Sequence, residues 1–205
     1  INYWQMKVAI DAGHGGTDSG CVSVLDGTNE SHYVLEVAKL VKDILEPYVE
    51  VVLTRKDDTF VSLRERCRDA NDQGVDLLVS LHTNSATTDA TGYEVFTSRG
   101  TTRADQLAKN LASRHIEAHT AQRNRGIKEA NYYMLKHTSM PAALVEFGFF
   151  SNLIEAEWLT QESTKKSVAR SVAMGILDFC GIAEKEDDDL TLEQRVARLE
   201  KHLGI

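Results

Sequence analysis

The sequence predicts an α/β fold with a mainly parallel β-sheet, and three observations carry this prediction. Short apolar runs of strand length alternate along the 205 residues with longer segments of helical periodicity, the order expected when helices join neighbouring parallel strands. The run at residues 76–82 is continuously apolar in its middle, as in a strand that is covered on both faces. The length suits one domain, since domains commonly span about 100–200 residues.

Strands are expected where a short apolar run meets a loop signal. The first covers residues 7–11 and leads into a segment, 12–29, that contains five glycines and can therefore turn tightly. The remaining strands are expected at residues 49–54, 76–82, 92–97 and 142–147. The segment that ends at Gly126 is expected to be a loop.

Helices are expected where apolar residues recur at helical spacing. The first, at residues 31–46, ends before Pro47, because a proline ring cannot continue the hydrogen-bond ladder. A second helix at residues 61–71 stops near Gly74. Further helices are expected at residues 104–119, 153–159 and 165–180.

Composition changes abruptly after Gly181. Residues 184–189 are all charged, and apolar residues then recur at spacings of 4, 3 and 4, at Leu192, Val196, Leu199 and Leu203. This spacing is typical of a coiled coil but extends over only about two heptads. The tail is therefore either a solvated or loosely docked helix, or a self-association helix or a stub that leads to a further module.

The chain is expected to divide into three parts. A methionine at position 6 makes the start resemble a processing remnant. The predicted parts are an N-terminal remnant at residues 1–6, a folded domain at 7–181, and an acidic linker with a short amphipathic helix at 182–205.

Charge and composition exclude several classes of partner. The chain has 23 basic and 31 acidic residues, a net charge of −8, which disfavours nucleic acid because phosphate binding depends on clustered Lys and Arg. No apolar run approaches the roughly 18 residues of a membrane span, so no membrane association is expected, and no secretory signal is visible. Three scattered cysteines are too few for a disulfide framework, which favours free thiols.

Four chemically active residues are expected to meet at one edge of the sheet. His14 follows the first strand, His82 closes the third, Glu146 lies near the end of the last, and Glu30 stands at the entrance to the first helix. Ligand sites in parallel α/β sheets form beyond the carboxyl ends of the strands. The four side chains should therefore converge.

Two imidazoles and a carboxylate suit a catalytic zinc ion with one open position for water. Zinc brings the pKa of a bound water to about 7, and a second carboxylate can serve as its general base and later protonate a leaving amine. His14, Glu30 and His82 would then be the ligands and Glu146 the base. Spacing alone leaves other assignments open.

A series of motifs extends this pattern over residues 7–181. In order, they are Asp11-Ala12-Gly13-His14-Gly15-Gly16 with Asp18, Gly20 and Glu30, Leu53-Thr54-Arg55, Arg66 with Ala70-Asn71, Ser80-Leu81-His82 with Asn84, Gly92-Tyr93-Glu94-Val95, Arg125-Gly126-Ile127-Lys128, and Pro141 to Gly148 with Phe149, Ser151 and Asn152. The ordered set resembles the zinc-dependent N-acetylmuramoyl-L-alanine amidase family.

The resemblance implies a fold, an activity and a site. The fold is a mixed, mainly parallel sheet flanked by helices on both faces, to which the short C-terminal helix would be added. The activity is hydrolysis of the amide between N-acetylmuramic acid and L-alanine in peptidoglycan, by one Zn²⁺ ion in a catalytic domain at residues 7–181. The family's zinc ligands fall on His14, Glu30 and His82, and its catalytic glutamate on Glu146.

The resemblance also implies action on the bacterial cell wall. The chain would be a phage endolysin released from the cytoplasm at lysis, or an autolysin in its mature secreted form. Two alternatives are a non-catalytic peptidoglycan-binding or regulatory domain on the same scaffold, and a zinc peptidase acting on another amide. The presence of all three ligands and the base favours the amidase.

Other histidines and a cysteine offer weaker sites. His115 and His119 lie four residues apart on one helix, but no glutamate follows His115, so the His-Glu-x-x-His pattern is absent and ordinary helix positions are favoured. His32 should point away from Glu30, and His137 and His202 should lie at the surface. A nucleophilic Cys67 would need a partner that the sequence does not identify.

Several polar and aromatic residues have a structural and a functional interpretation. Asp11 and Asn84 could orient the ligating imidazoles or shape turns. Arg66 and Asn71 are expected to anchor the second helix rather than touch substrate. Three aromatic residues beside Glu146 could line a groove, although core packing is favoured: Phe147, Phe149 and Phe150.

Arg125 and Lys128 also have two interpretations. They could bind carboxylates of a stem peptide, or they could belong to a solvated loop.

Overall fold

The computed structural model describes residues 6–100 and 102–184. The predicted tail helix at 182–205 lies almost wholly outside these ranges, as does most of the predicted N-terminal remnant. None of the described helices is long and apolar enough to cross a membrane.

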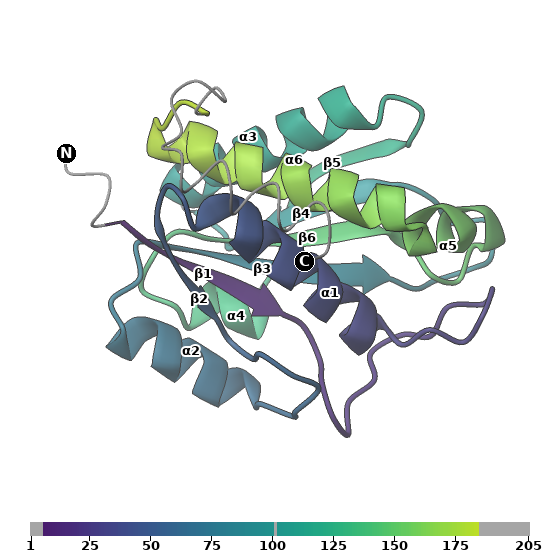
Figure 1. Cartoon of the computed structure of the whole chain (residues 1–205), viewed down its shortest axis with the longest axis horizontal. Coiled ribbons are helices and arrows are strands. Elements are labelled where there is room, and N and C mark those ends of the chain that lie inside the picture. Colours follow the sequence, from purple (N-terminus) through teal and green to yellow (C-terminus); the bar gives the residue numbers. More distant parts are fainter. Residues whose placement is uncertain (1–5, 101, 185–205) are drawn as a thin grey trace, which may run out of the picture.

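A six-stranded sheet forms the centre of the molecule, in the order β2-β1-β3-β6-β4-β5 (Figure 1). All neighbouring strands are parallel except β4 and β6, which are antiparallel. The predicted mixed, mainly parallel sheet is thus confirmed. The strands are β1 (Lys7–Ala12), β2 (Glu50–Leu53), β3 (Leu77–Asn84), β4 (Tyr93–Thr97), β5 (Asn124–Glu129) and β6 (Ala142–Phe149).

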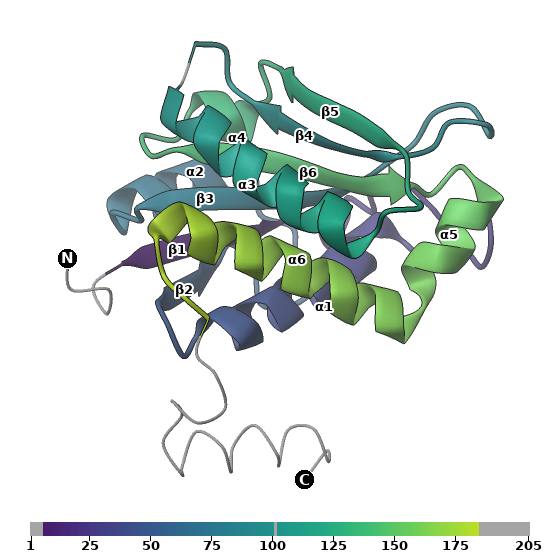
Figure 2. The same cartoon turned by 90° about the horizontal axis from the view of Figure 1, so that it is seen from above.

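Helices cover both faces of the sheet, as predicted (Figure 2). Three long helices pack on one face: α1 (Glu30–Leu45), α3 (Thr102–Ala118) and α6 (Glu162–Cys180). Two shorter helices pack on the other: α2 (Leu63–Asp72) and α4 (Tyr133–Lys136). A sixth helix, α5 (Leu153–Thr160), follows β6 directly.

Local sequence signals set the ends of these helices. Ser62 and Glu65 form a capping box at the start of α2, which satisfies two backbone N–H groups and explains why the helix begins two residues later than predicted. Gly181 ends α6 in the left-handed conformation, with φ 69°, which glycine adopts without steric cost. Helix α1 ends at Leu45, just before Pro47.

Strand β5 is the main difference from the predicted fold. Its sequence, NRGIKE, contains a single large apolar residue, and its side chains are partly or fully exposed. It lies at the edge of the sheet and pairs only with β4, so its pattern is that of a solvated edge rather than a buried strand. The predicted loop up to Gly126 is therefore wrong for residues 124–126.

Alternation along the central strands decides which side chains face the site. Leu81 and Val145 pack into the core beneath α1, α3 and α6, so their neighbours His82 and Glu146 point to the opposite face. On that face α2 and α4 pack against earlier strand residues such as Leu78 and Ala142. The side chains of His82 and Glu146 lie further along this face, toward the carboxyl ends of β3 and β6.

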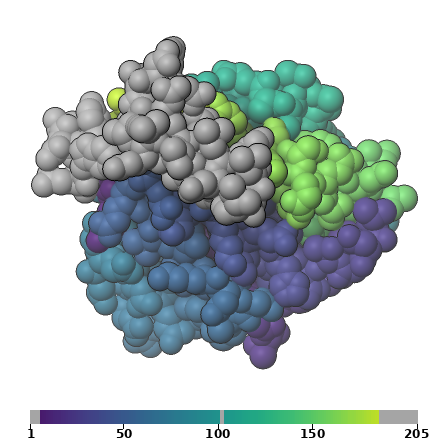
Figure 3. All heavy atoms as spheres, in the orientation of Figure 1, coloured from purple at the N-terminus to yellow at the C-terminus, as the bar shows by residue number. Residues whose placement is uncertain are grey.

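The long connection from β1 to α1 lies at the surface. Figure 3 shows its purple atoms beside those of α1. Gly15, Gly16, Gly20 and Gly27 all have positive φ, so the predicted tight turns are confirmed.

Candidate metal centre

The structure brings together the three residues that were expected from the sequence to be metal ligands. One donor atom each from His14, Glu30 and His82 lies within 4.8 Å of the others. His14 comes from the loop after β1, Glu30 is the first residue of α1, and His82 lies in β3. Within the described residues no other group of three histidine, cysteine or acidic side chains meets in this way.

Glu30 lies between the two histidines. Its Oε1 atom is 2.9 Å from His82 Nδ1 and 3.3 Å from His14 Nε2. The backbone N–H groups of Thr83 and Cys21 also donate to its two oxygens, at 3.0 and 2.9 Å. These bonds hold a buried carboxylate in one orientation, so the chain fixes this donor before any metal binds.

Close packing around the loop explains its glycines. A Cβ atom on Gly13 would lie 2.2 Å from His82 Cε1, and one on Gly20 would lie 2.6 Å from Glu30 Oε2. His14 itself has φ 59°, a left-handed conformation that non-glycine residues rarely adopt. Such strained residues often occur at functional sites.

Asp18 orients the first histidine. Its Oδ2 atom accepts a hydrogen bond from His14 Nδ1 at 2.9 Å, which leaves Nε2 to face Glu30 and the centre. Carboxylates commonly hold ligating imidazoles in this way. Asp18 belongs to the glycine-rich motif, and its place four residues after His14 is the signal that could have identified it.

At each of the three residues, burial and the neighbouring charges act on the pKa in opposite directions. Burial alone would lower the pKa of His14, but Glu30 and Asp18 raise it to about 9. The pKa of His82 is also raised, because Glu30 outweighs burial. Burial would raise the pKa of Glu30, but the two histidines hold it well below its ordinary range. A cation at this point therefore meets a carboxylate that is already ionised.

Glu146 lies beside this group on the next strand. It is the register partner of His82 across β3 and β6. Its Oε2 atom is buried and has no hydrogen-bond partner among the described residues. Burial raises the pKa of Glu146 to about 7, and the Glu30 and Glu94 carboxylates add to the shift. An unpaired carboxyl group with a pKa near neutrality is suited to proton transfer.

Asp11 and Arg66 have structural roles. Arg66 Nη1 donates to Asp11 Oδ1 at 2.8 Å, and the same carboxylate accepts hydrogen bonds from Thr54 and Ser80. Of the two interpretations of Asp11, these partners favour the structural one. Arg66 also donates to the carbonyl of His14, so α2 is anchored to the loop, as predicted.

Asn71 and Asn84 bond to partners away from the histidines. Asn71 donates to the carbonyl of His137 at 3.0 Å and accepts from Ser139, which confirms its anchoring role. Asn84 donates to Glu94 Oε1 at 2.7 Å rather than to an imidazole.

Sequence reasoning gave no role to Glu94, which the structure places next to Glu146. The two residues are register partners across β4 and β6. Glu94 is buried and forms ion pairs with Arg125 and Lys128 of β5. A charged residue inside the otherwise uncharged strand Tyr93–Thr97 was the available signal.

The remaining candidate residues are accounted for by packing. His115 is buried and stacks on Tyr93, with ring centroids 3.6 Å apart, as expected of an ordinary helix residue. His32 is exposed and contacts Asp58, away from Glu30. Burial raises the pKa of the Cys67 thiol to about 11, so this cysteine is not an activated nucleophile.

Surface and core assignments hold for the other aromatic and histidine residues. Phe147, Phe149 and Phe150 are buried, which confirms core packing. His137 is exposed, and His202 lies outside the described residues.

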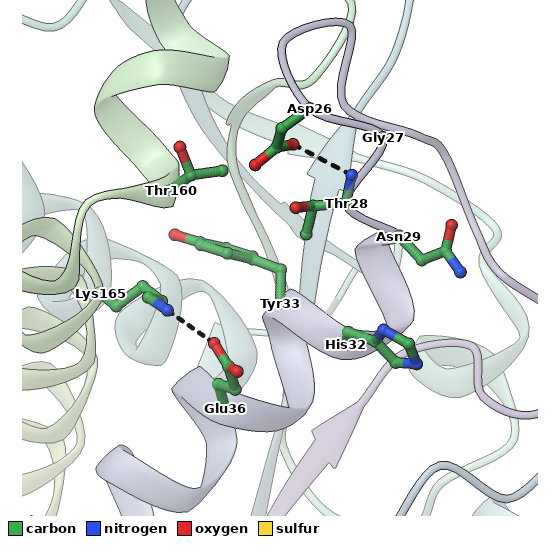
Figure 4. A pocket seen from close by; sticks show the side chains of 9 residues that line it. All are labelled: Asp26, Gly27, Thr28, Asn29, His32, Tyr33, Glu36, Thr160 and Lys165. Carbon is green, nitrogen blue, oxygen red and sulfur yellow. Dashed lines mark hydrogen bonds and ion pairs between the residues drawn. The ribbon is translucent and has the colours of Figure 1, made fainter.

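A separate hollow of about 480 Å³ lies where α1 meets α6 and the loop before α1 (Figure 4). Tyr33, Glu36, Thr160 and Lys165 line it, and Lys165 forms an ion pair with Glu36. None of the four site residues lines this hollow. It is therefore distinct from the metal centre.

Together, the donor atoms fit a single metal ion. Two imidazoles and one ionised carboxylate are the donor set of catalytic zinc sites with an open position. The buried and unpaired Oε2 atom of Glu146 stands next to them on the same face of the sheet. The arrangement can support hydrolysis by a metal ion and a carboxylate base.

Comparison with known proteins agrees with this chemistry. A family model described as N-acetylmuramoyl-L-alanine amidase matches residues 8–178. The chain is 34% identical over 175 residues to the N-acetylmuramoyl-L-alanine amidase CwlM of Bacillus licheniformis, over 84% of this chain and 68% of that protein. It is 37% identical over 186 residues to the endolysin of Bacillus phage SPP1, over 87% of this chain and 67% of the phage protein.

A solved structure shows the same fold. The catalytic domain of CwlV, an N-acetylmuramoyl-L-alanine amidase from Bacillus (Paenibacillus) polymyxa var. colistinus, matches with a TM-score of 0.83 and 35% identity. The match covers 87% of this chain and 100% of that one. Because the family model also spans well over half of the sequence, the chain belongs to the N-acetylmuramoyl-L-alanine amidase family of hydrolases.

Proposed function

We propose that this chain hydrolyses the amide between N-acetylmuramic acid and L-alanine in peptidoglycan with one zinc ion held by His14, Glu30 and His82. The observation that carries the proposal is the meeting of three donor atoms within 4.8 Å beside the unpaired carboxylate of Glu146. Zinc is the proposed metal because mixed imidazole and carboxylate donors with an open position suit it. The site of action is the bacterial cell wall, as an endolysin or an autolysin.

Each side chain has a defined task in this mechanism. When bound, zinc supplies Lewis acidity toward the scissile carbonyl and toward water. Glu146 accepts a proton from the attacking water and then donates it to the leaving amine of L-alanine. Burial raises the pKa of this carboxyl group above its ordinary value, which suits a group that must both accept and release a proton. Asp18 and the backbone N–H groups on Glu30 keep the ligands oriented while the substrate reacts.

The test is to identify the new ends formed in purified peptidoglycan. Zinc-loaded protein should release intact stem peptides with a free L-alanine amine, and a chelator should abolish the release until zinc is restored. New reducing sugar ends would instead indicate glycan cleavage, and new amines on other residues would indicate a peptidase. Either result would contradict the proposal, as would full activity in the chelated protein.

We also propose that the catalytic domain ends near Gly181. Helix α6 ends there, and the family model ends at residue 178. The suggested self-association through residues 182–205 rests on apolar spacing alone. Solution mass measured before and after truncation at Gly181 tests it: a dimer that becomes a monomer supports self-association, and a monomer in both cases contradicts it.

A further inference from the structure

The sheet carries a row of functional side chains that extends beyond Glu146. His82, Glu146 and Glu94 are successive register partners on β3, β6 and β4. On the next strand, Lys128 of β5 pairs with Phe96, two residues along β4 from Glu94. Figure 2 shows these four strands side by side. Adjacent strands lie about 4.8 Å apart, so each step from one strand to the next in this row adds about that distance from the metal centre.

Glu94 holds two cations on this face. Its carboxylate is only 3% exposed, and Oε2 accepts a hydrogen bond from Arg125 Nε at 2.9 Å and one from Lys128 Nζ. Oε1 accepts from Asn84. A buried carboxylate with this many partners is fixed in place, and it fixes the two cations in turn.

Part of the cationic charge remains accessible. The side chains of Arg125 and Lys128 are 25% and 40% exposed. Two cations against one carboxylate leave one positive charge, and neither cation bonds to Glu146 in the described part of the chain. Lys128 uses one of its three N–H donors for Glu94, and among the described residues the others are left for a ligand.

Aromatic rings support the same two cations. The Arg125 guanidinium carbon lies 4.9 Å from the centroid of Phe149, and Lys128 Nζ lies 5.7 Å from that of Phe96. Tyr132, an exposed residue, packs edge-on against Phe96. Cation–π contact and the buried anion restrict both long side chains, which reduces the entropy lost when they bind a ligand.

The strand order and the proposed function together give a direction for the bound substrate. Under the proposed function, which this step assumes, the scissile carbonyl faces the metal ligands His14, Glu30 and His82, and the leaving amine lies over Glu146 on β6. The peptide that follows the amine then continues over β4 and β5. An extended peptide advances about 3.3–3.6 Å per residue, so the residue after L-alanine reaches the neighbourhood of Glu94 and Lys128.

We infer that Arg125 and Lys128, held by Glu94, form a subsite for a carboxylate on the stem-peptide residue that follows L-alanine. Such a local positive charge is useful in a chain whose net charge is −8, because an acidic protein gives an anionic substrate no general attraction. Lys128 contacts the ligand in this subsite, and Glu94 is a positioning residue.

The test compares two muramoyl-peptide substrates that differ at one group. In one the residue after L-alanine bears a free carboxylate, and in the other the same group is a carboxamide. Zinc-loaded native protein should hydrolyse the carboxylate substrate with a KM lower by about tenfold and a similar kcat, the scale of one charged hydrogen bond. The ratio of the two kcat/KM values is the readout.

Variants separate binding from support of the fold. Lys128→Met should lower the ratio to near one, and Lys128→Arg, which keeps the charge, should retain most of the preference. Lys136→Met changes an exposed lysine on α4 and is the matched control, with the native ratio expected. If Lys128→Met lowers kcat equally for both substrates, the cations serve only to support Glu94 and the subsite is overturned.

The native protein alone distinguishes two kinds of failure. Hydrolysis of both substrates with the same KM would overturn the subsite and leave the amidase assignment intact. Hydrolysis of neither substrate would overturn the amidase assignment, and the subsite with it.

Discussion

His82 of β3 and Glu146 of β6 are register partners on adjacent parallel strands, and both side chains leave the sheet on the face opposite α1, α3 and α6. One proposed metal ligand and the proposed base therefore share a rigid frame. The other two proposed ligands, His14 and Glu30, come from the loop and helix that follow β1. The geometry of the site depends on how tightly that loop packs against β3.

Gly13 is the closest point of that packing, and its replacement should displace a ligand. A Cβ atom at Gly13 would lie 2.2 Å from His82 Cε1, so Gly13→Ala must move the His82 ring. We expect zinc affinity and kcat each to fall by at least about tenfold, since ligand misplacement of this size is costly. Zinc affinity measured by competition with a chelator, together with kcat, provides the check.

Gly74→Ala is the control for backbone strain. Gly74 has positive φ and Gly13 does not, and no atom lies within 4 Å of a Cβ built at Gly74, so Gly74→Ala strains the backbone without a steric clash. This variant should lose stability and keep native zinc affinity. Native zinc affinity in Gly13→Ala would show that the loop does not constrain His82.

The buried pair of Arg66 and Asp11 should contribute strongly to stability. The two side chains are each 1% exposed and their charged atoms lie 2.8 Å apart. Arg66→Met leaves the Asp11 charge buried without its partner, which should cost about 3–5 kcal/mol. Urea unfolding of the native protein and the variant measures the difference.

The double variant Asp11→Asn with Arg66→Met tests the cause. Removing both charges should recover part of the lost free energy of unfolding, because no uncompensated charge remains buried. A double variant that is less stable than Arg66→Met alone would show that packing, not charge, explains the loss.

His115 should make the protein less stable in mild acid. Burial lowers the pKa of His115 to about 3, although Gln122 accepts a hydrogen bond from its Nε2 atom. In the unfolded chain the pKa is about 6.5, so between these values only the unfolded state binds the proton. The stabilisation is present above pH 6.5 and is lost as the pH falls, by about 2 kcal/mol at pH 5.

Unfolding free energies of native protein and His115→Gln between pH 7 and pH 5 check this contribution. The variant should show a smaller loss over that interval, whatever its stability at pH 7. The exposed His137→Gln variant is the matched control. An identical pH dependence in His115→Gln and the native protein would mean that His115 is protonated in the folded state.

The sequence predicts most of the fold because most elements bury an apolar pattern. Helix α1 and the strands β1, β3 and β6 each carry such a pattern, and their order along the chain indicates a parallel sheet. Strand β5 could not be found in this way, since an edge strand with solvated side chains has no apolar pattern. Its pairing with β4 depends on contacts distant in sequence.

The site residues also divide into those that the sequence predicts and those that it does not. His14, Glu30 and His82 are recognisable because strand ends and a helix start bring them to one edge of the sheet. The roles of Asp18 and Glu94 depend on loop conformation and on β4–β6 register, which local sequence does not determine. The ion pairs of Arg125 and Lys128 with Glu94 depend on the pairing of β5 with β4, which local sequence also does not determine.

The separation of metal ligands from the base is the central claim, and one experiment tests it directly. Zinc content and amide hydrolysis are measured on the same preparations of native protein, Glu146→Gln and His82→Ala. We predict one zinc per chain in the native protein and in Glu146→Gln, whose hydrolysis should fall by about 10²–10⁴-fold, and loss of both zinc and hydrolysis in His82→Ala. Glu146→Gln that hydrolyses at the native rate, or His82→Ala that retains both zinc and activity, would contradict the account.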